Sequence, residues 1–150
     1  MAHSYSSMLF HLVWSTKGRH PLILPEIKNR LYGYIRQITN DEGSKIIVMN
    51  GMPDHIHILL GIKPNMNLSD LIRQIKTTSS KWVQKTFQEK GEFGWQDGYG
   101  AFSVGMSTLQ AVKCYIQNQE EHHLKQSFQE EFIGFLNVHG IGYDPRFVIE

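Results

Sequence analysis

Hydrophobic and polar residues follow two different periods along this chain, and these periods predict strands and helices in a mixed order. Residues 7–14 form an apolar and aromatic run that is typical of a largely buried strand. Residues 45–49 and 55–60 are two further β-prone runs, and the turn-forming residues at 50–54 predict that they form a hairpin. A fourth strand is expected at residues 101–104, after a stretch punctuated by glycines.

Apolar residues recur at helical spacing in the segments between and after these strands. Residues 25–40 predict an amphipathic helix, and Asn67 can cap a second one that has apolar residues on one side and basic residues on the other. Residues 107–126 contain no glycine or proline and predict a third helix. Ser127 and Glu130 have the spacing of a capping box, which predicts a short fourth helix.

The order β-α-β-β-α-β followed by helices predicts an α+β fold. It is the ferredoxin-like, or RRM-like, pattern of an antiparallel sheet with helices on one face, here extended by C-terminal helices. A chain of 150 residues with 41% hydrophobic content is long enough to bury a core and lies within the size range of one domain. We therefore expect a single domain over residues 1–150.

Composition says more about the cellular compartment of the protein than about its binding partners. The net charge is only +1, from 15 basic and 14 acidic residues, so bulk charge does not indicate a nucleic-acid partner. Cys114 is the only cysteine, which excludes an intramolecular disulfide and favours a reducing cytoplasm. No apolar run approaches the roughly twenty residues that span a bilayer, so we expect no membrane partner.

Two histidines of the predicted hairpin are candidates for a metal site. Side chains alternate along a strand, so His55 and His57 should point to the same face. Two imidazoles on a rigid strand can bind a divalent metal and leave positions open for water or substrate. The alternative is that one or both only sit on a half-exposed face of the sheet.

The predicted third helix carries a second group of candidates. Tyr115 and Gln119 are one helical turn apart and project from the same side, beside an apolar stripe that should meet the core. Tyr115 would then border a small polar surface. The alternative is an ordinary, partly buried tyrosine whose hydroxyl has a hydrogen-bond partner.

Other residues that could act as a nucleophile or metal ligand have less support from the sequence. Cys114 lacks the basic or helix-terminal setting that would favour its thiolate as a nucleophile. His122 and His123 are adjacent on a helix and point about 100° apart, so we expect them in a solvated or partner-facing role rather than in one metal site. The remaining histidines have no partner identifiable by spacing and are expected to be structural or solvent-exposed: His3, His11, His20 and His139.

Several short motifs occur in one order over nearly the whole chain. They are Phe10 to Lys17 (FHLVWSTK), Pro53 to Leu60 (PDHIHILL), Trp95-Gln96, Gly98 to Val104 (GYGAFSV), Tyr115 to His123 (YIQNQEEHH), Phe128 to Phe132 (FQEEF) and Gly142 to Asp144 (GYD). Together they resemble the single-tyrosine HUH transposases of bacterial insertion sequences, in the group named after insertion sequences two hundred and six hundred and five.

The resemblance implies a mechanism and assigns its residues. His55 and His57 would be the HUH metal ligands, Gln119 the third ligand and Tyr115 the nucleophile, carried by the C-terminal helices. The metal would be Mg²⁺ or Mn²⁺. Single-stranded DNA at the ends of an insertion sequence would be cut through a 5′-phosphotyrosine and rejoined without ATP, which serves DNA transposition.

The resemblance also implies the partners. Members of the family work as homodimers whose active sites are shared between subunits, and they recognise DNA hairpins at element ends. Basic residues near the predicted site are candidates for phosphate contacts, although each could equally be a solvated surface charge: Lys17, Arg19, Arg73, Lys76 and Lys81.

Two other functions fit parts of the sequence. A non-catalytic module with the same topology could bind nucleic acid by stacking bases on its sheet, but it would give no reason for Gln119. A domesticated relative could keep the site and act on chromosomal repeats. Covalent attachment to DNA would separate the first from a transposase, and genomic context would separate the second.

Overall fold

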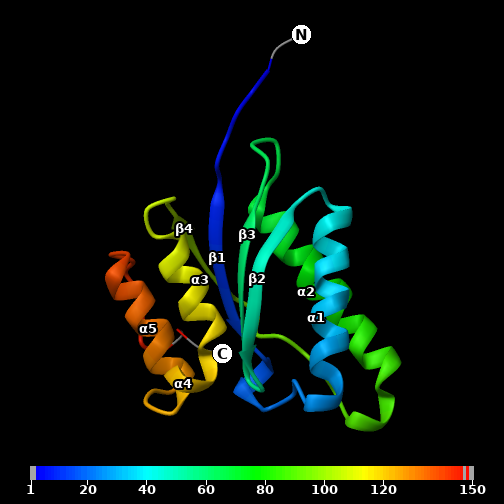
Figure 1. The fold of residues 1–150 in the computed structure, drawn as a ribbon. Helices are drawn as coiled ribbons and strands as arrows, with labels where there is room; N and C mark the ends of the chain where they lie inside the picture. Colours follow the sequence, from blue (N-terminus) through cyan, green and yellow to red (C-terminus); the bar gives the residue numbers. More distant parts are fainter. Residues whose placement is uncertain (1–2, 147, 149–150) are drawn as a thin grey trace.

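The computed structural model contains one antiparallel sheet of four strands in the order β2-β3-β1-β4 (Figure 1). The structure describes residues 3–146 and 148. The strands are β1 (Leu9–Ser15), β2 (Lys45–Met52), β3 (His55–Gly61) and β4 (Gly100–Val104). All four strands that the sequence predicts are therefore present, and their order is that of the ferredoxin-like fold.

Helices cover both faces of this sheet (Figure 1). α1 (Pro25–Asp41) and α2 (Leu68–Thr86) pack side by side on one face, as the α+β prediction requires. The C-terminal helices lie on the other face: α3 (Leu109–Gln117), α4 (Gln119–His123) and α5 (Phe128–Val138). Two short 3₁₀ turns, Lys17–Arg19 and Gln88–Lys90, follow β1 and α2.

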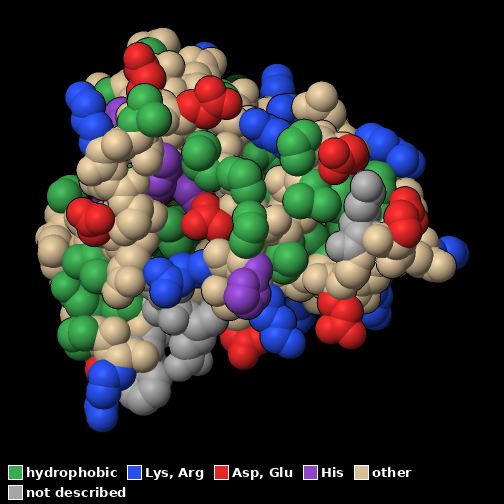
Figure 2. Space-filling view, turned by 90° about the horizontal axis from the view of Figure 1, so that it is seen from below, with side chains coloured by type: hydrophobic (Ala, Val, Ile, Leu, Met, Phe, Trp, Pro, Cys, Tyr) green, Lys and Arg blue, Asp and Glu red, His purple; other side chains and the backbone are tan. Residues whose placement is uncertain are grey.

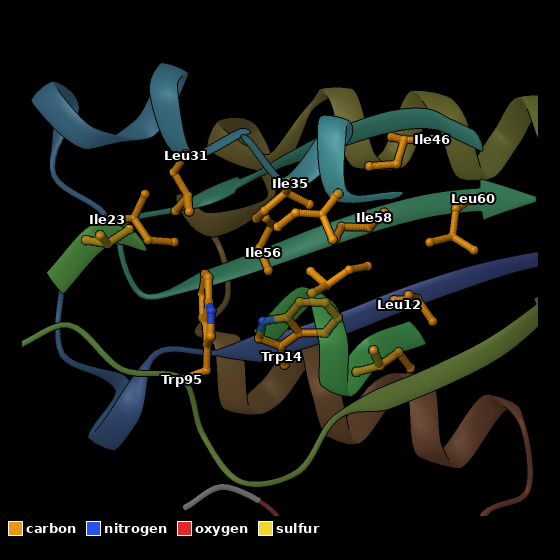
Figure 3. Packing of buried hydrophobic residues seen from close by; sticks show 14 of the residues in the cluster. Leu12, Trp14, Ile23, Leu31, Ile35, Ile46, Ile56, Ile58, Leu60 and Trp95 are labelled. Carbon is orange, nitrogen blue, oxygen red and sulfur yellow. The ribbon is translucent and has the colours of Figure 1, made fainter. Parts of the chain in front are cut away.

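The main core lies between the sheet and the α1–α2 pair (Figure 3). Alternate residues of the two central strands point into it, among them Trp14 of β1 and Ile58 of β3. Leu31 and Ile35, one turn apart on α1, meet them from the helix layer. Because the alternation fixes which residues enter this core, the residues between them must face the C-terminal helices.

A smaller apolar cluster joins the other face of the sheet to α5. It consists of Val13, Phe102, Phe128, Phe132 and Leu136. The aromatic residues of this cluster come mainly from α5, so that helix is held against the sheet by its apolar stripe. The polar residues of the same layer then meet the sheet beside this cluster.

The predicted third helix over residues 107–126 is wrong in one respect, because the structure divides it into α3 and α4 at Asn118. The backbone of Asn118 leaves helical geometry, with φ −103° and ψ 34°. The side-chain amide of Asn50 on β2 donates to the carbonyls of Ile116 and Gln117, both at 3.1 Å. In a continuous helix these carbonyls would accept hydrogen bonds from backbone N–H groups of the next turn. Here the side chain of Asn50 on the sheet donates those hydrogen bonds instead.

The β2–β3 hairpin brings two backbones unusually close together at Gly51. A Cβ atom at this position would lie 2.2 Å from the carbonyl oxygen of His55, which leaves no room for any side chain. Gly51 pairs with Ile56 in the register of the hairpin. The backbone that carries His55 is thus fixed by a neighbour that must be glycine.

Candidate active site

His55 and His57 stand side by side on β3, on the face covered by the C-terminal helices. Both are fully buried, and their ring centroids are 5.2 Å apart. One nitrogen of each ring is held by a second residue: His55 Nδ1 lies 2.7 Å from Asp54 Oδ1, and His57 Nδ1 lies 2.7 Å from His11 Nε2. These contacts leave both Nε2 atoms directed toward the same polar cluster.

Three side chains of α4 and α5 meet these nitrogen atoms. Gln119 Oε1 lies 3.1 Å from His55 Nε2, and Glu131 Oε1 lies 2.8 Å from His57 Nε2. His123 Nε2 lies 3.1 Å from the same oxygen of Gln119. These five side chains therefore come from β3, α4 and α5 of the same chain.

The donor atoms of this cluster suit a divalent metal ion. The side chains of His55, His57, His123 and Glu131 each offer one ligand atom, and these four atoms lie within 4.8 Å of one another. Imidazole nitrogen with carboxylate or amide oxygen is a common ligand set for first-row divalent metals. Figure 2 shows histidine side chains at the surface of the face seen from below, whereas the side chains of His55 and His57 are fully buried.

Tyr115 on α3 reaches the same cluster from the side. Its hydroxyl donates to Glu131 Oε2, and its ring stacks on His122 with centroids 4.2 Å apart. The ring lies edge-on to His57 at 6.0 Å. The structure thus brings Tyr115, His55, His57 and Gln119 together.

The charges in the site are strongly coupled. Burial would raise the pKa of Glu131, but the hydrogen bonds from His57 and Tyr115 lower it to about 2. Burial lowers the pKa of His57, and Glu131 only partly opposes this effect. Burial and the Glu131 carboxylate raise the pKa of the Tyr115 phenol. The tyrosine therefore carries its proton in this state of the site.

The expected solvated or partner-facing role of His123 is wrong, because His123 lies inside the site. The break at Asn118 starts a new helix, and in α4 Gln119 and His123 are one turn apart on the same side. His122 points elsewhere and covers the ring of Tyr115. The two side chains point in different directions, as expected for neighbours on a helix. Only that of His122 points away from the cluster.

Sequence reasoning missed His11 and Glu131. On β1, period-two alternation places His11 on the same face as Val13, which pairs directly with His57. On α5, Glu131 comes three residues after Phe128 and falls within the apolar stripe of the helix. A charged residue at a buried position of an amphipathic helix was the signal that could have revealed it.

Most of the candidate DNA-contact residues line two adjoining cavities. Arg73, Lys76 and Lys81 line the first, on the outer side of α2, and Lys17 lines the second. Ser80, Gln84, Trp95 and Asp97 belong to both linings, so we treat the two as one basic groove.

Three of these cations have partners within the chain, and one of them is Arg73, which forms an exposed ion pair with Asp70 at 2.7 Å. Lys76 Nζ donates to the backbone carbonyls of Gln96 at 2.6 Å and Gly98 at 2.8 Å, and burial lowers its pKa to about 8. Arg19 lies apart from the groove, in a cleft that it shares with His123, and donates to Gln129. Lys17 and Lys81 are thus the exposed lysines of the groove.

Comparison with known proteins gives consistent results. A family model described as "Transposase IS200 like" matches residues 4–119. The transposase TnpA of ISDra2 from Deinococcus radiodurans is 28% identical over 117 residues, which cover 75% of this chain and 84% of that protein. The transposase of insertion sequence element IS200 from Salmonella typhimurium is 28% identical over 127 residues, which cover 81% of this chain and 82% of that protein.

Solved structures show the same fold. A Deinococcus radiodurans protein described as a transposase has a TM-score of 0.63 and 27% identity, covering 79% of this chain and 96% of that one. A REP-associated tyrosine transposase bound to a REP hairpin has a TM-score of 0.59 and 15% identity, covering 77% of this chain and 68% of that one. Within the described residues, no helix is long and apolar enough to cross a membrane.

Proposed function

The chain belongs to the family of IS200-like transposases, and we propose that it cuts and rejoins single-stranded DNA at insertion-sequence ends through Tyr115. As a transposase of this family, it cleaves DNA and transfers a strand. The observation that carries the proposed chemistry is the position of the Tyr115 hydroxyl, which lies in the same cluster as His55 and His57. This arrangement has the parts that a covalent phosphotyrosine mechanism needs.

In the proposed reaction, Tyr115 acts as a covalent nucleophile. Its oxygen bonds to the scissile phosphorus as the bond from phosphorus to the 3′ oxygen breaks, which gives a 5′-phosphotyrosine and a free 3′-hydroxyl. The phenol gives up its proton and the departing 3′ oxygen takes one up. Because the intermediate keeps two ester bonds to phosphorus, a second 3′-hydroxyl can attack it, restore the phosphodiester and release Tyr115 without ATP.

We assign His55, His57 and Gln119 as ligands of a divalent metal, Mg²⁺ or Mn²⁺. When bound, this cation would polarise the phosphate and offset negative charge that develops during attack. Asp54 and His11 hold the two imidazole rings in place. A ligand bond at Nε2 of His57 requires its proton on Nδ1, where His11 Nε2 can accept it.

The basic groove is the proposed path of the DNA strand. Lys17, Arg73 and Lys81 supply positive charge for phosphates along it. Gln96 in its lining accepts a hydrogen bond from the backbone of Ser15 at 2.6 Å, and Ser15 pairs with His55 in the sheet. A strand lying in the groove would thus run close to the end of β1 beside the histidine pair.

The remaining features of the proposal follow from the family. We expect a homodimer that exchanges its nucleophile-bearing helices, a DNA hairpin as the recognised form of the element end, and action in the cytoplasm. In the single chain, α3 packs against its own β2 and β3, which places Tyr115 beside the histidines of the same subunit. An exchanged dimer would place the same residues against the sheet of the partner.

The decisive experiment is the detection of a covalent adduct. The protein is incubated with Mg²⁺ or Mn²⁺ and single strands from both ends of the insertion sequence that encodes it, and the products are separated under denaturing conditions. We expect a protein–DNA adduct that disappears in Tyr115→Phe, because phenylalanine has no nucleophilic oxygen. EDTA should prevent the adduct, and added Mn²⁺ should restore it.

Tyr34→Phe is the matched control, because Tyr34 stacks on Trp82 in the helix layer on the other face of the sheet. This variant should form the adduct at the normal rate. An adduct that persists in Tyr115→Phe would exclude Tyr115 as the nucleophile. Strand binding without any adduct under either metal would instead support a non-catalytic nucleic-acid-binding module.

A further inference from the structure

Glu131 is a buried carboxylate that the proposed chemistry has not yet used. It lies on α5 with 2% of its surface exposed, and it is the only acidic residue in the described part of the chain that is buried to this degree. A capping box formed by Ser127 and Glu130 starts the helix one turn earlier. The position of Glu131 is thus set by a well-defined helix start.

The two carboxylate oxygens of Glu131 have different neighbours. Oε1 lies 2.8 Å from His57 Nε2, 3.3 Å from His123 Nε2 and 3.5 Å from His55 Nε2. Oε2 accepts the hydrogen bond of the Tyr115 hydroxyl. One oxygen therefore lies among the imidazole nitrogens, and the other holds the nucleophile.

A buried carboxylate needs positive charge close by. The partners of Glu131 are histidines and a tyrosine, and within the described residues no lysine or arginine forms an ion pair with it. A divalent cation at the converging Nε2 atoms would supply the missing charge. The same cation would lie within reach of Oε1, because that oxygen and the nitrogens lie within 4.8 Å of one another.

We propose that Glu131 is a further metal ligand through Oε1 and that its Oε2 positions the Tyr115 hydroxyl. This inference rests on the metal centre of the proposed function and adds a negatively charged ligand to the neutral Gln119. A carboxylate ligand strengthens cation binding by direct charge attraction. One side chain then joins the cation to the nucleophile, and removing its charge affects both.

The test measures metal binding directly, without DNA. Binding of Mn²⁺ to the full-length protein is followed by the loss of the electron paramagnetic resonance signal of free Mn²⁺. We expect Glu131→Gln to weaken Mn²⁺ binding by roughly tenfold to a hundredfold. Adduct formation should also stay below the wild-type rate at saturating Mn²⁺, because the amide no longer positions Tyr115 in the same way.

Two further variants separate a ligand from a merely structural residue. Glu130→Gln is the matched control: Glu130 is the exposed neighbour of Glu131, and glutamine keeps the capping box, so Mn²⁺ affinity should not change. Glu131→Asp keeps the negative charge on a shorter side chain and should recover part of the Mn²⁺ affinity lost in Glu131→Gln. Circular dichroism checks that each variant is folded.

Each outcome bears on a different part of the proposal. Wild-type affinity for Mn²⁺ in a folded Glu131→Gln variant would overturn Glu131 as a ligand and leave the Tyr115 chemistry intact. Equal weakening in the Asp and Gln variants would also overturn it, since charge would then not matter. A wild-type protein that binds no Mn²⁺ would overturn both this inference and the proposed metal centre.

Discussion

At the scale of single residues, polar atoms in the helix layer are satisfied less completely than those in the active site. Every polar side chain of the histidine cluster has at least one partner. The hydroxyl of Tyr32 on α1 is buried and has no hydrogen-bond partner among the described residues. Burial raises the pKa of this phenol. The cost in stability comes from the buried hydroxyl group, which loses its hydrogen bonds to water without gaining a partner.

Replacing Tyr32 by phenylalanine should stabilise the protein. Removal of the unpaired hydroxyl should increase the free energy of unfolding by about 1 kcal/mol at pH 7, measured by urea denaturation. Because the pKa of Tyr32 is raised in the folded state, ionisation of this phenol has no effect on stability below the unfolded pKa of about 10. Above that pH the unfolded chain ionises first, so the stability of the wild type falls as pH rises. Tyr32→Phe should therefore lose less stability than wild type above pH 10.

Tyr34→Phe serves again as the comparison, because its ring stacks on Trp82 with centroids 4.5 Å apart on the same helix layer. Its alkaline stability profile should follow that of the wild type. A loss of stability in Tyr32→Phe at pH 7 would show that the hydroxyl has a favourable partner.

The residues of the candidate site differ in how readily they can be predicted from the sequence. His55 and His57 could be paired by strand alternation, and Gln119 and Tyr115 by the helical turn between them. The apolar stripe of α5 could mark Glu131 as buried, but its partners could not be identified, because His57 and Tyr115 lie 74 and 16 positions away from it in sequence. Only the packing of α5 on the sheet brings its carboxylate to the histidines.

At the scale of elements, the junction between α3 and α4 determines where Tyr115 lies relative to Gln119. Tyr115 comes before the break at Asn118 and Gln119 comes after it. The break is held by the two hydrogen bonds from Asn50 to the last carbonyls of α3. Local periodicity predicted one continuous helix because this partner is on a strand more than sixty residues away.

Replacing Asn50 by alanine should loosen this junction. We expect a loss of about 1 kcal/mol in the free energy of unfolding, since two carbonyl groups lose their donor. Adduct formation should slow by roughly tenfold or more, because small displacements of a nucleophile have large effects on rate. Single-turnover cleavage assays at saturating Mn²⁺ measure this rate.

Asn29→Ala is the control for this prediction, because Asn29 is exposed on α1. It should change neither the cleavage rate nor the stability appreciably. A normal cleavage rate in Asn50→Ala would mean that the α3–α4 junction does not position Tyr115.

At the scale of the whole molecule, charge is distributed unevenly in spite of a net charge of +1. Positive side chains gather along the groove beside α2, whereas the buried carboxylate lies on the other face of the sheet. The amphipathic pattern of α2 predicted this basic side correctly. The groove itself could not be predicted, because its lining combines α2 with the loop around Trp95 and the turn after β1.

Neutralising Lys81 should reduce the salt dependence of DNA binding. The slope of log Kd against log salt for a single strand should fall by about 0.7 in Lys81→Gln, if the lysine contacts one phosphate. Fluorescence anisotropy with a labelled oligonucleotide, repeated over a range of salt concentrations, gives this slope.

Lys85→Gln is the matched comparison, because Lys85 is exposed one turn further along the same helix and outside both groove linings. Its slope should equal that of the wild type. Equal slopes for all three proteins would remove Lys81 from the DNA path.

The two-sided packing of the sheet also determines when the site is completed during synthesis. All four strands and the α1–α2 layer are contained in the chain up to Val104, whereas Tyr115, Gln119 and Glu131 follow it. During synthesis the chain leaves the ribosome N-terminus first. The segments that carry the histidine pair thus emerge before Tyr115 does, and a chain that stops after β4 contains both histidines without the proposed nucleophile.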